Sequence, residues 1–230
     1  MSRFIIDPSF STLFPAAQIG VVVAHHLDQS AGFPAAELAQ ANHDAQQFLG
    51  ADPFSQNPVV QTWRAVYHQF KTKKGARSSI EALLKRVDKG QPVHPIAPLV
   101  DAYNTISLRY GLPVGGEDLA TFVGDMHLTV ATGGEAFWPL GSDHNEPALP
   151  GEVIYRDQQD VICRCFNWRE GQRTLLTDWT RDAVFVLEQP QGTGPVAAAV
   201  PALADLLTTH FQAAVTTQIL TADSPELVLD

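Results

Sequence analysis

The sequence predicts an α+β fold in which layered, mixed β-sheets carry helices packed on one side. Helical periodicity dominates the first half of the chain, strand-like runs dominate the second half, and one further helical segment comes near the end. This order differs from that of a repeating strand–helix barrel, and no internal repeat is evident. We expect residues 1–230 to form a single free-standing domain.

The N-terminal part, about 15–90, is expected to hold one strand and three helices. The β-branched run AQIGVVVAHHL at 17–27 predicts a buried strand. Ser78 and Glu81 have the spacing of a capping box, which marks the start of the third helix. Helical periodicity and end signals predict the three helices at 33–50, 57–70 and 77–90.

The later part begins with a helix over 98–110, which carries Asn104 beside its apolar stripe. The glycine-containing segment after that helix predicts a thin loop. A closing helix is expected at about 196–215, and the acidic tail 222–230 is expected to be loose. Between them, alternation and turn residues predict strands at 125–132, within 133–141, and at 151–157, 160–168 and 183–188.

Composition excludes several classes of protein. Apolar residues make up 45% of the chain and charged residues 17%, as in ordinary soluble globular proteins. No apolar run approaches the roughly 18 residues that span a membrane, and the N-terminus lacks the pattern of a signal peptide. The two cysteines, Cys163 and Cys165, suit neither a disulfide framework nor a cysteine zinc site. We therefore expect a cytoplasmic protein with no membrane partner.

Charge is distributed unevenly along the chain. The formal net charge is −10, which argues against general nucleic-acid binding, and no DNA partner is expected. Residues 61–90 nevertheless hold a strong excess of basic groups. Such a patch on an acidic body is typical of selective contact with a polyanion, and equally of a solvated helical face. The candidate RNA-binding residues are Arg64, Lys71, Lys73, Lys74, Arg77, Lys85 and Arg86.

Several motifs of well-defined chemistry are missing from the sequence. It has no glycine-rich phosphate loop, no HExxH and no GxSxG. The eight histidines are scattered, so no metal site and no cofactor are expected. A thiol on a buried strand, such as that of Cys165, is usually inert. Local chemistry alone therefore names no catalytic residue.

Four stretches of the second half occur in an ordered, spaced pattern. They are VDAYNTISLRYGLPVGGEDL (100–119), VGDMHLTVATGGEAFWPLG (123–141), LPGEVIYRD (149–157) and TDWTRDAVFVLE (177–188). The pattern resembles the tRNA-editing domain of the phenylalanyl-tRNA synthetase beta subunit, which is formed by its third and fourth domains. The resemblance is strongest over residues 97–190. The whole chain looks like a free-standing bacterial member of that domain family, and the resemblance implies the same fold.

The resemblance also implies a pocket. In the synthetase domain, a helix asparagine and the loop after it receive the 3′ end of a mischarged tRNA, from which tyrosine is hydrolysed. Asn104 matches that asparagine, and Gly115 and Gly116 would let backbone N–H groups approach a ligand. Glu188 lies two residues beyond the family glutamate that reads the tyrosine hydroxyl; it would face the same cavity or stand at the surface. The alternative is that Asn104 caps a neighbouring strand and the glycines only turn the chain.

The sequence departs from the family pattern in two places. The family histidine of the loop is replaced by Gly115, which leaves no evident general base. The glycine-rich wall of the pocket is replaced by residues 165–172, where Asn167, Trp168 and Arg169 are candidate substrate-binding groups. Trp168 would stack on a terminal adenine or belong to the core.

Three functions stay open on the sequence. The first is a trans-acting editor that binds tRNA and hydrolyses a misacylated aminoacyl-tRNA ester, with the 61–90 segment on the acceptor-stem phosphates. The second is a non-catalytic module that binds RNA or an amino acid. The third is a small-molecule enzyme that reuses the pocket through Glu117, Asp118 and Arg169. If the protein is an enzyme, we expect an aminoacyl-tRNA deacylase, with tRNA as its partner.

Overall fold

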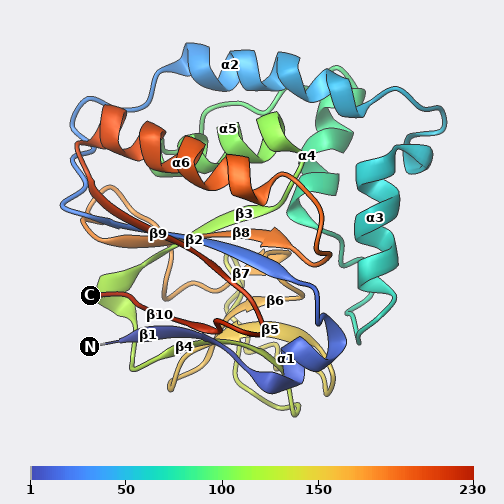
Figure 1. Ribbon diagram of the computed structural model, residues 1–230, viewed down its shortest axis with the longest axis vertical. Helices are drawn as coiled ribbons and strands as arrows, with labels where there is room; N and C mark the ends of the chain where they lie inside the picture. The colour runs from blue at the N-terminus through green and yellow to red at the C-terminus, as the bar shows by residue number, and fades with distance from the viewer. Residues whose placement is uncertain (1) are drawn as a thin grey trace.

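Two β-sheets pack against each other in the computed structural model, which describes residues 2–230 (Figure 1). The four-stranded sheet is antiparallel and consists, in spatial order, of β3 (Val114–Asp118), β8 (Ala183–Gln189), β2 (Gln18–His25) and β9 (Ala214–Leu220). The six-stranded sheet consists of β10 (Glu226–Val228), β1 (Arg3–Ile6), β4 (Met126–Val130), β5 (Val153–Arg156), β6 (Val161–Arg164) and β7 (Arg169–Glu170).

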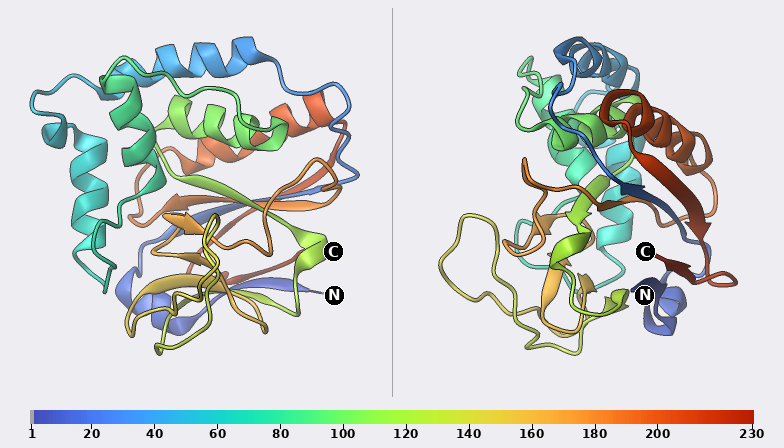
Figure 2. Two further views of the ribbon diagram at one scale, coloured as in Figure 1. Left: turned by 180° about the vertical axis from the view of Figure 1, so that it is seen from behind. Right: turned by 90° about the vertical axis from the view of Figure 1, so that its left-hand side faces the viewer.

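Helices cover the outer face of the four-stranded sheet. The α-helices are α1 (Pro8–Leu13), α2 (Ala35–Asp44), α3 (Pro58–Tyr67), α4 (Ser79–Asp88), α5 (Pro98–Tyr110) and α6 (Val196–Phe211). Short 3-10 turns occur at η1 (Ala45–Phe48), η2 (Phe54–Gln56) and η3 (Leu119–Thr121). Both views place α5 and α6 on the sheet, α2 above them, and α3 and α4 beside the layers (Figures 1 and 2).

The predicted α+β class, with layered mixed sheets and helices on one side, is confirmed. The six-stranded sheet is mixed because β1 pairs with β4 in parallel, whereas its other pairs are antiparallel. The predicted helix boundaries hold to within a few residues, and the helix predicted at 33–50 ends as the 3-10 turn η1. The Ser78 hydroxyl accepts a hydrogen bond from the Glu81 backbone N–H at 3.3 Å, which confirms the predicted cap of α4.

The side chains of β8 explain why this sheet is buried on both faces. Phe185 and Leu187 pack in the cluster shared with α5 and α6, whereas Val184 and Val186 pack in the cluster shared with the six-stranded sheet. Successive strand residues point to opposite faces, so a strand that is apolar at every position must be covered on both. The sheet therefore lies between two hydrophobic layers.

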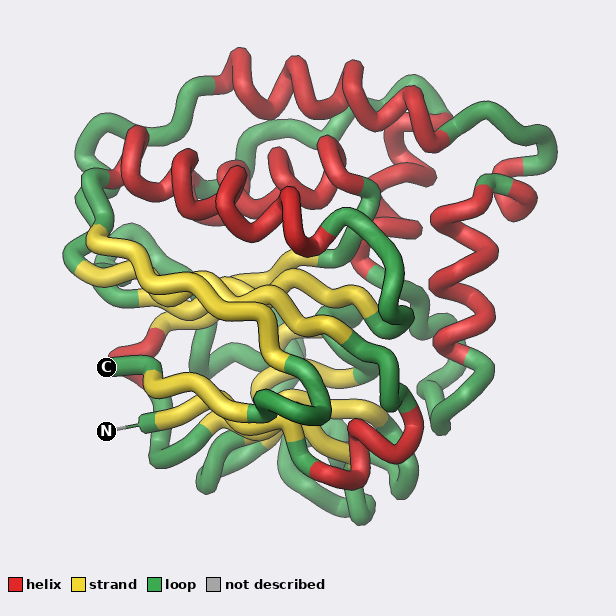
Figure 3. The backbone as a smooth tube through the Cα atoms, viewed as in Figure 1, coloured by secondary structure: helices red, strands yellow, loops and turns green. Residues whose placement is uncertain are grey.

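The C-terminal tail is ordered, and its prediction as a loose segment is wrong. β10 pairs with β1 in antiparallel register, with Phe4 opposite Leu227, and the Leu229 backbone N–H donates to the Ser2 carbonyl at 2.9 Å. The tube trace shows the two ends of the chain side by side at the edge of the sheet (Figure 3). Leu229 is buried, and burying this side chain offsets the entropy lost by fixing the tail.

The prediction of a strand within 133–141 is also wrong. Gly133 and Gly134 have positive φ angles, and this segment pairs by an isolated bridge from Pro139 to Gly171. The segment is held instead by a neighbouring loop, where the Asn145 side chain accepts from the Phe137 N–H at 2.9 Å. Among the helices that the structure describes, none combines the length and the apolar character that crossing a membrane requires.

Candidate functional site

Asn104 lies on α5, which begins at Pro98 and ends where Gly111 adopts a left-handed conformation with φ 67°. Its side chain is 7% exposed, and its amide has no hydrogen-bond partner among residues 2–230. Asn104 therefore does not cap a strand. Its amide atoms keep some contact with solvent, which can satisfy them in place of a protein partner.

Gly115 and Gly116 lie in strand β3, so the prediction of a thin loop is wrong. They pair with Val186 and Phe185 of β8. A Cβ atom on Gly115 would come within 2.7 Å of the Asn167 side chain, and one on Gly116 within 2.7 Å of the Phe185 ring. Close packing therefore favours glycine strongly at Gly116, and less at Gly115, where the end of the Asn167 side chain can move; neither residue has a positive φ angle.

The outer edge of β3 is joined to residues 174–176 by a bridge between Glu117 and Leu175. The Glu188 N–H donates to the Pro113 carbonyl at 3.0 Å, which fixes the register of the two strands. Because backbone groups alternate along an antiparallel strand, the N–H of Gly116 and that of Asp118 face away from β8. The Asp118 N–H donates to the Thr174 carbonyl at 2.8 Å. The Gly116 N–H has no partner in the part of the chain that the structure describes.

The strand predicted at 160–168 ends at Arg164, and residues 165–168 form the turn of the β6–β7 hairpin. Cys165 and Phe166 both have positive φ angles, 50° and 57°, which is the backbone of a tight hairpin turn. The Tyr67 hydroxyl holds the turn by donating to the Cys165 carbonyl at 2.6 Å. The Phe166 ring lies 5.6–5.7 Å from four aromatic rings, those of Phe10, Phe14, Trp63 and Phe70.

The three candidate residues after this turn have different surroundings. The backbone N–H of Asn167 donates to Glu188 Oε1 at 3.0 Å, and its side chain covers Gly115. Trp168 is partly buried against the core shared by the two sheets. Arg169 Nη1 lies 3.5 Å from Glu146 Oε2. Among these candidates, Asn167 contacts both Gly115 and Glu188.

Glu188 is buried rather than at the surface, being 1% exposed. It accepts hydrogen bonds from the Tyr155 hydroxyl at 3.0 Å and from the Asn167 N–H, while its Oε2 has no partner. Burial raises the pKa of this carboxyl well above its ordinary value, against the effect of the Tyr155 and Asn167 hydrogen bonds. The neutral acid is therefore favoured.

A second group contains the buried Glu117, which the sequence suggested only for the small-molecule enzyme, and the partly buried Glu170. We call it the acidic cluster, and its residues are Tyr103, Glu117, Cys163, Glu170 and Thr174. The Cys163 thiol donates to Glu117 Oε1 at 3.1 Å, and the Tyr103 hydroxyl lies 3.4 Å from Glu170 Oε1. Cys163 and Glu170 are directly opposite in the β6–β7 hairpin. Three elements, α5, β3 and the hairpin, thus bring these groups together.

The acidic cluster favours protonated carboxyls. Burial, followed by the charge of Glu170, raises the pKa of Glu117 well above its ordinary value. Burial likewise raises the pKa of Glu170 and that of the Cys163 thiol, so the thiol stays protonated. The Thr174 hydroxyl lies close enough to oppose the rise in the pKa of Glu117, yet its geometry satisfies no hydrogen bond. Two carboxyls that interact in such surroundings bind and release their protons as a pair.

Unsatisfied polar atoms are concentrated in this region. Such atoms are few in native structures and need an explanation. Among the described residues, buried side-chain atoms without a partner occur on Ser79 and on four residues of the region, namely Glu117 (Oε2), Asn167 (Nδ2), Thr174 (Oγ1) and Glu188 (Oε2). All four lie on β3, β8 or the segment between β6 and β8.

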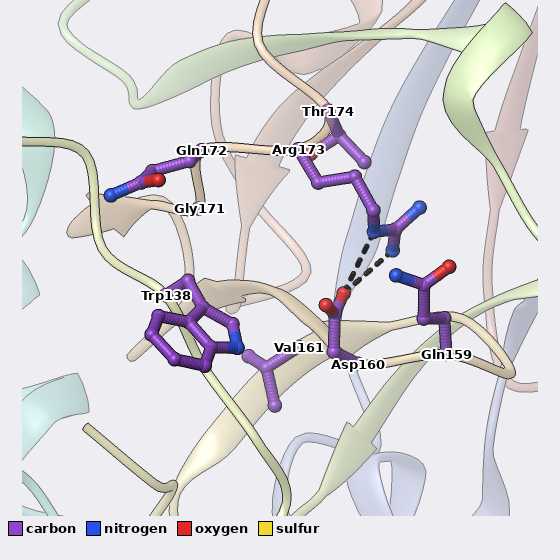
Figure 4. A pocket seen from close by; sticks show the side chains of 8 residues that line it. All are labelled: Trp138, Gln159, Asp160, Val161, Gly171, Gln172, Arg173 and Thr174. Carbon is purple, nitrogen blue, oxygen red and sulfur yellow. Dashed lines mark hydrogen bonds and ion pairs between the residues drawn. The ribbon is translucent and has the colours of Figure 1, made fainter. Parts of the chain in front are cut away.

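A cavity of about 390 Å³ opens beside the acidic cluster (Figure 4). Thr174 belongs both to its wall and to the cluster. The half-exposed ring of Trp138 forms another part of the wall, and Arg173 is held there by the carboxylates of Asp157 at 2.8 Å and Asp160 at 2.7 Å. The remaining wall residues are Gln159, Val161, Gly171 and Gln172. We call this space the Trp138 cavity.

The basic segment divides into two parts. Residues 68–78, which we call the basic loop, join α3 to α4 and touch the hairpin region, since Lys73 pairs with Glu146, which Arg169 also approaches. Lys71, Lys74 and Arg77 on this loop are exposed. Lys85 and Arg86 lie in the last turn of α4, about 10 Å along the helix from its start at Ser79, where the basic loop ends. Arg64 is paired with the buried Glu81 at 2.7 Å.

Sequence reasoning thus found one wall of the region and missed Tyr103, Glu170, Thr174 and Trp138. Their neighbours Asn104, Arg169 and Glu117 were singled out, but the contacts join residues up to 67 positions apart. The available signal was the Arg-Glu pair at 169–170 after a hairpin turn, which a charge pattern alone does not distinguish from a surface pair. No group of three or more metal-binding side chains occurs among the residues described.

Comparisons with known proteins complete the description of the region. A family model described as the B3/4 domain matches residues 62–193, more than half of the chain. Among solved structures, the chain is similar to an N-terminal fragment of the phenylalanyl-tRNA synthetase beta subunit from Pyrococcus horikoshii, with 9% sequence identity and a TM-score of 0.46. That match covers 94% of this chain and 53% of the fragment, so the chain spans about half the fragment's length. No match was found among curated proteins.

Proposed function

The chain belongs to the B3/4 domain family, and from this premise we propose that it binds the aminoacylated 3′ end of a tRNA and hydrolyses the ester bond. This proposal keeps the resemblance to the beta-subunit editing domain and adds a chemical centre. The observation that carries it is the acidic cluster, where Glu117 Oε2 and Thr174 Oγ1 are enclosed and unpartnered, and where Thr174 also belongs to the wall of the Trp138 cavity.

The hydrolytic step needs a base, a water molecule and a donor for the oxyanion. In its ionised form, Glu117 would take a proton from a water molecule held between its free oxygen and the Thr174 hydroxyl. The resulting hydroxide would attack the ester carbon, the bond from that carbon to the ribose oxygen would break, and the proton would pass to that oxygen. A carboxyl with a raised pKa is a stronger base when ionised than an ordinary glutamate, and it can return the proton to the leaving oxygen.

The Gly116 N–H would stabilise the oxyanion. It points away from β8 and has no partner among the described residues, so it would not have to break an existing hydrogen bond. A preorganised donor of this kind contributes about 3–4 kcal/mol to lowering a barrier. Asn104, Asn167 and Glu188 would orient the amino acid, as the resemblance implies.

The basic loop would hold the tRNA. Lys71, Lys74 and Arg77 are exposed beside the hairpin, so phosphates of the acceptor end would meet positive charge next to the site. Lys85 and Arg86 stand farther along α4 and would contact a more distant part of the stem.

The test is deacylation of a panel of charged tRNAs by the purified protein. The panel includes Tyr-tRNA-Phe and Phe-tRNA-Phe, and the variants are Glu117→Gln and Asn104→Ala. Glu37→Gln, on α2 and outside the cluster, is the matched control. Selective hydrolysis that falls at least about 100-fold in Glu117→Gln supports the proposal. Equal hydrolysis by wild type and Glu117→Gln contradicts the assigned base.

A second candidate function is binding of the same RNA end without hydrolysis. One observation favours it: the Asn167 side chain covers Gly115, the position that matches the family histidine, and fills space there. Binding that weakens as salt rises, with no turnover of any charged tRNA, would establish this alternative.

A further inference from the structure

We propose that the Trp138 cavity is a binding site for an adenine base. The inference extends the proposed function and rests on it for the source of that base, the terminal adenosine of a tRNA. The cavity itself is argued from its own residues. Its volume of about 390 Å³ lies in the range of small-ligand sites.

The first argument is the exposed aromatic wall. Trp138 is 45% exposed although it belongs to the cavity wall, and its ring stands next to Val161 in the close-up (Figure 4). Gly171 adds no side chain to the opposite wall, and a Cβ atom there would come within 2.9 Å of the Ile162 carbonyl. A planar ring can therefore lie against the indole, which is how unpaired bases stack on proteins.

The second argument is the charge of the cavity. Arg173 donates to Asp160, to Asp157 and, through Nη1 at 2.6 Å, to the Thr121 carbonyl. Its guanidinium is therefore occupied, and the two carboxylates exceed its charge. A phosphate would be repelled by this wall, whereas a neutral heterocycle would not.

The third argument is the pattern of free polar groups. The Gln172 amide is oriented because its Nε2 donates to the Pro139 carbonyl at 2.9 Å, which leaves Oε1 as an acceptor. The exocyclic amine of adenine supplies a donor at that position, whereas the carbonyl of hypoxanthine or guanine would place oxygen against oxygen. Thr174 belongs to the cavity wall, and its hydroxyl oxygen is enclosed without a partner on the side of the acidic cluster.

This arrangement also gives the ester a position. Thr174 lies in both the Trp138 cavity and the acidic cluster, so a base in the cavity would bring its ribose toward Glu117. Trp138, rather than the partly buried Trp168, would then be the stacking residue.

The experiment is calorimetric titration of the full chain with adenosine and, separately, with inosine, which differs at the exocyclic group. We expect adenosine to bind and inosine to bind at least about tenfold more weakly. Trp138→Ala should weaken adenosine binding by about 5- to 150-fold, and Trp138→Phe should restore part of it. Trp179→Ala is the matched control, because Trp179 is 83% exposed on another loop.

Two outcomes overturn the inference: adenosine binding that Trp138→Ala leaves unchanged, and no adenosine binding up to about 10 mM. Thermal unfolding of each variant shows whether it is folded. The experiments distinguish failure of the adenine-binding inference from failure of the proposed function. Adenosine binding through Trp138 without binding or turnover of charged tRNA would keep the cavity assignment and overturn the editing proposal. Hydrolysis of charged tRNA that Trp138→Ala leaves unchanged would keep the editing proposal and overturn the assignment of the cavity.

Discussion

The two faces of the four-stranded sheet bury different kinds of side chain. Toward α5 and α6 the buried side chains are mostly apolar, among them Val22, Phe185 and Leu187, and the buried Gln189 is satisfied there by the Val196 N–H at 3.0 Å. Toward the six-stranded sheet, Val184 and Val186 are joined by two buried carboxyls, Glu117 and Glu188, each with one oxygen lacking a partner. The first face has the composition of a core. The second combines a core with groups that a core alone does not need, which is typical of a site where function is placed at a cost in stability.

The largest effect is expected on the apolar face. Phe185→Ala removes a fully buried ring that packs on α5 and on Gly116, so the free energy of unfolding should fall by about 3–5 kcal/mol. Urea unfolding followed by circular dichroism measures this. A loss under about 1 kcal/mol would mean that this face is loosely packed and that the contrast between the faces is wrong.

The two glycines of β3 sharpen the contrast within one strand. Gly116→Ala places a Cβ atom against the Phe185 ring and should lower stability by about 1–3 kcal/mol. Gly115→Ala meets only the end of the Asn167 side chain, which can move, so its effect should be smaller. The double variant Gly115→Ala, Asn167→Gly should recover the loss. The reverse order of the two single variants, measured by urea unfolding, would contradict the packing described here.

The face toward the six-stranded sheet, which holds Glu117 and Glu188, should make the stability of the protein depend on pH. Below the ordinary pKa of a glutamate, Glu117 is protonated in the folded and the unfolded chain alike. Above it, the unfolded chain releases the proton while the folded chain keeps it, because burial raises the folded-state pKa. Stability should therefore fall as pH rises through this window, by up to about 1.4 kcal/mol per pH unit, until the folded-state pKa is reached.

Glu117→Gln removes the titratable group and so tests whether Glu117 lowers stability as pH rises. The advantage of the variant in unfolding free energy should be small near pH 4.5, the ordinary pKa of a glutamate carboxyl, and should grow toward neutral pH. Urea unfolding of both proteins across that range gives the comparison. Parallel stability curves would show that the Glu117 proton is not held by the fold.

The smallest effect is expected outside both faces. Lys74→Ala should change stability by less than about 0.5 kcal/mol, since Lys74 is exposed and forms no ion pair among the described residues. If the basic loop contacts tRNA phosphates, the variant should lower the salt dependence of binding by about one ion. Lys89→Ala, with the same charge change just beyond α4, is the control. An equal response of both variants would remove the basic loop from the proposed contact.

The sequence predicted the local elements correctly where the pattern was strong. The Pro98 start and the Gly111 end of α5 agree with the structure, as does the capping pair Ser78 and Glu81 of α4. It failed where pairing across the chain decided the outcome. Gly115 and Gly116 were predicted to form a loop because glycine favours turns. In the structure they pair with β8, and close neighbours favour their small size. The tail read as loose because nothing local shows that β1 would pair with it.

The sequence by itself determined the α+β class, the positions of most helices and strands, and the membership of the B3/4 family, because periodicity, caps and ordered motifs are local along the chain. Tertiary structure alone decided the acidic cluster and the Trp138 cavity. Glu117 meets Cys163 across 46 residues, and Tyr103 meets Glu170 across 67. A carboxyl carries no mark of burial in its own sequence, since its surroundings, and hence its pKa, are set by the strands and helices packed around it.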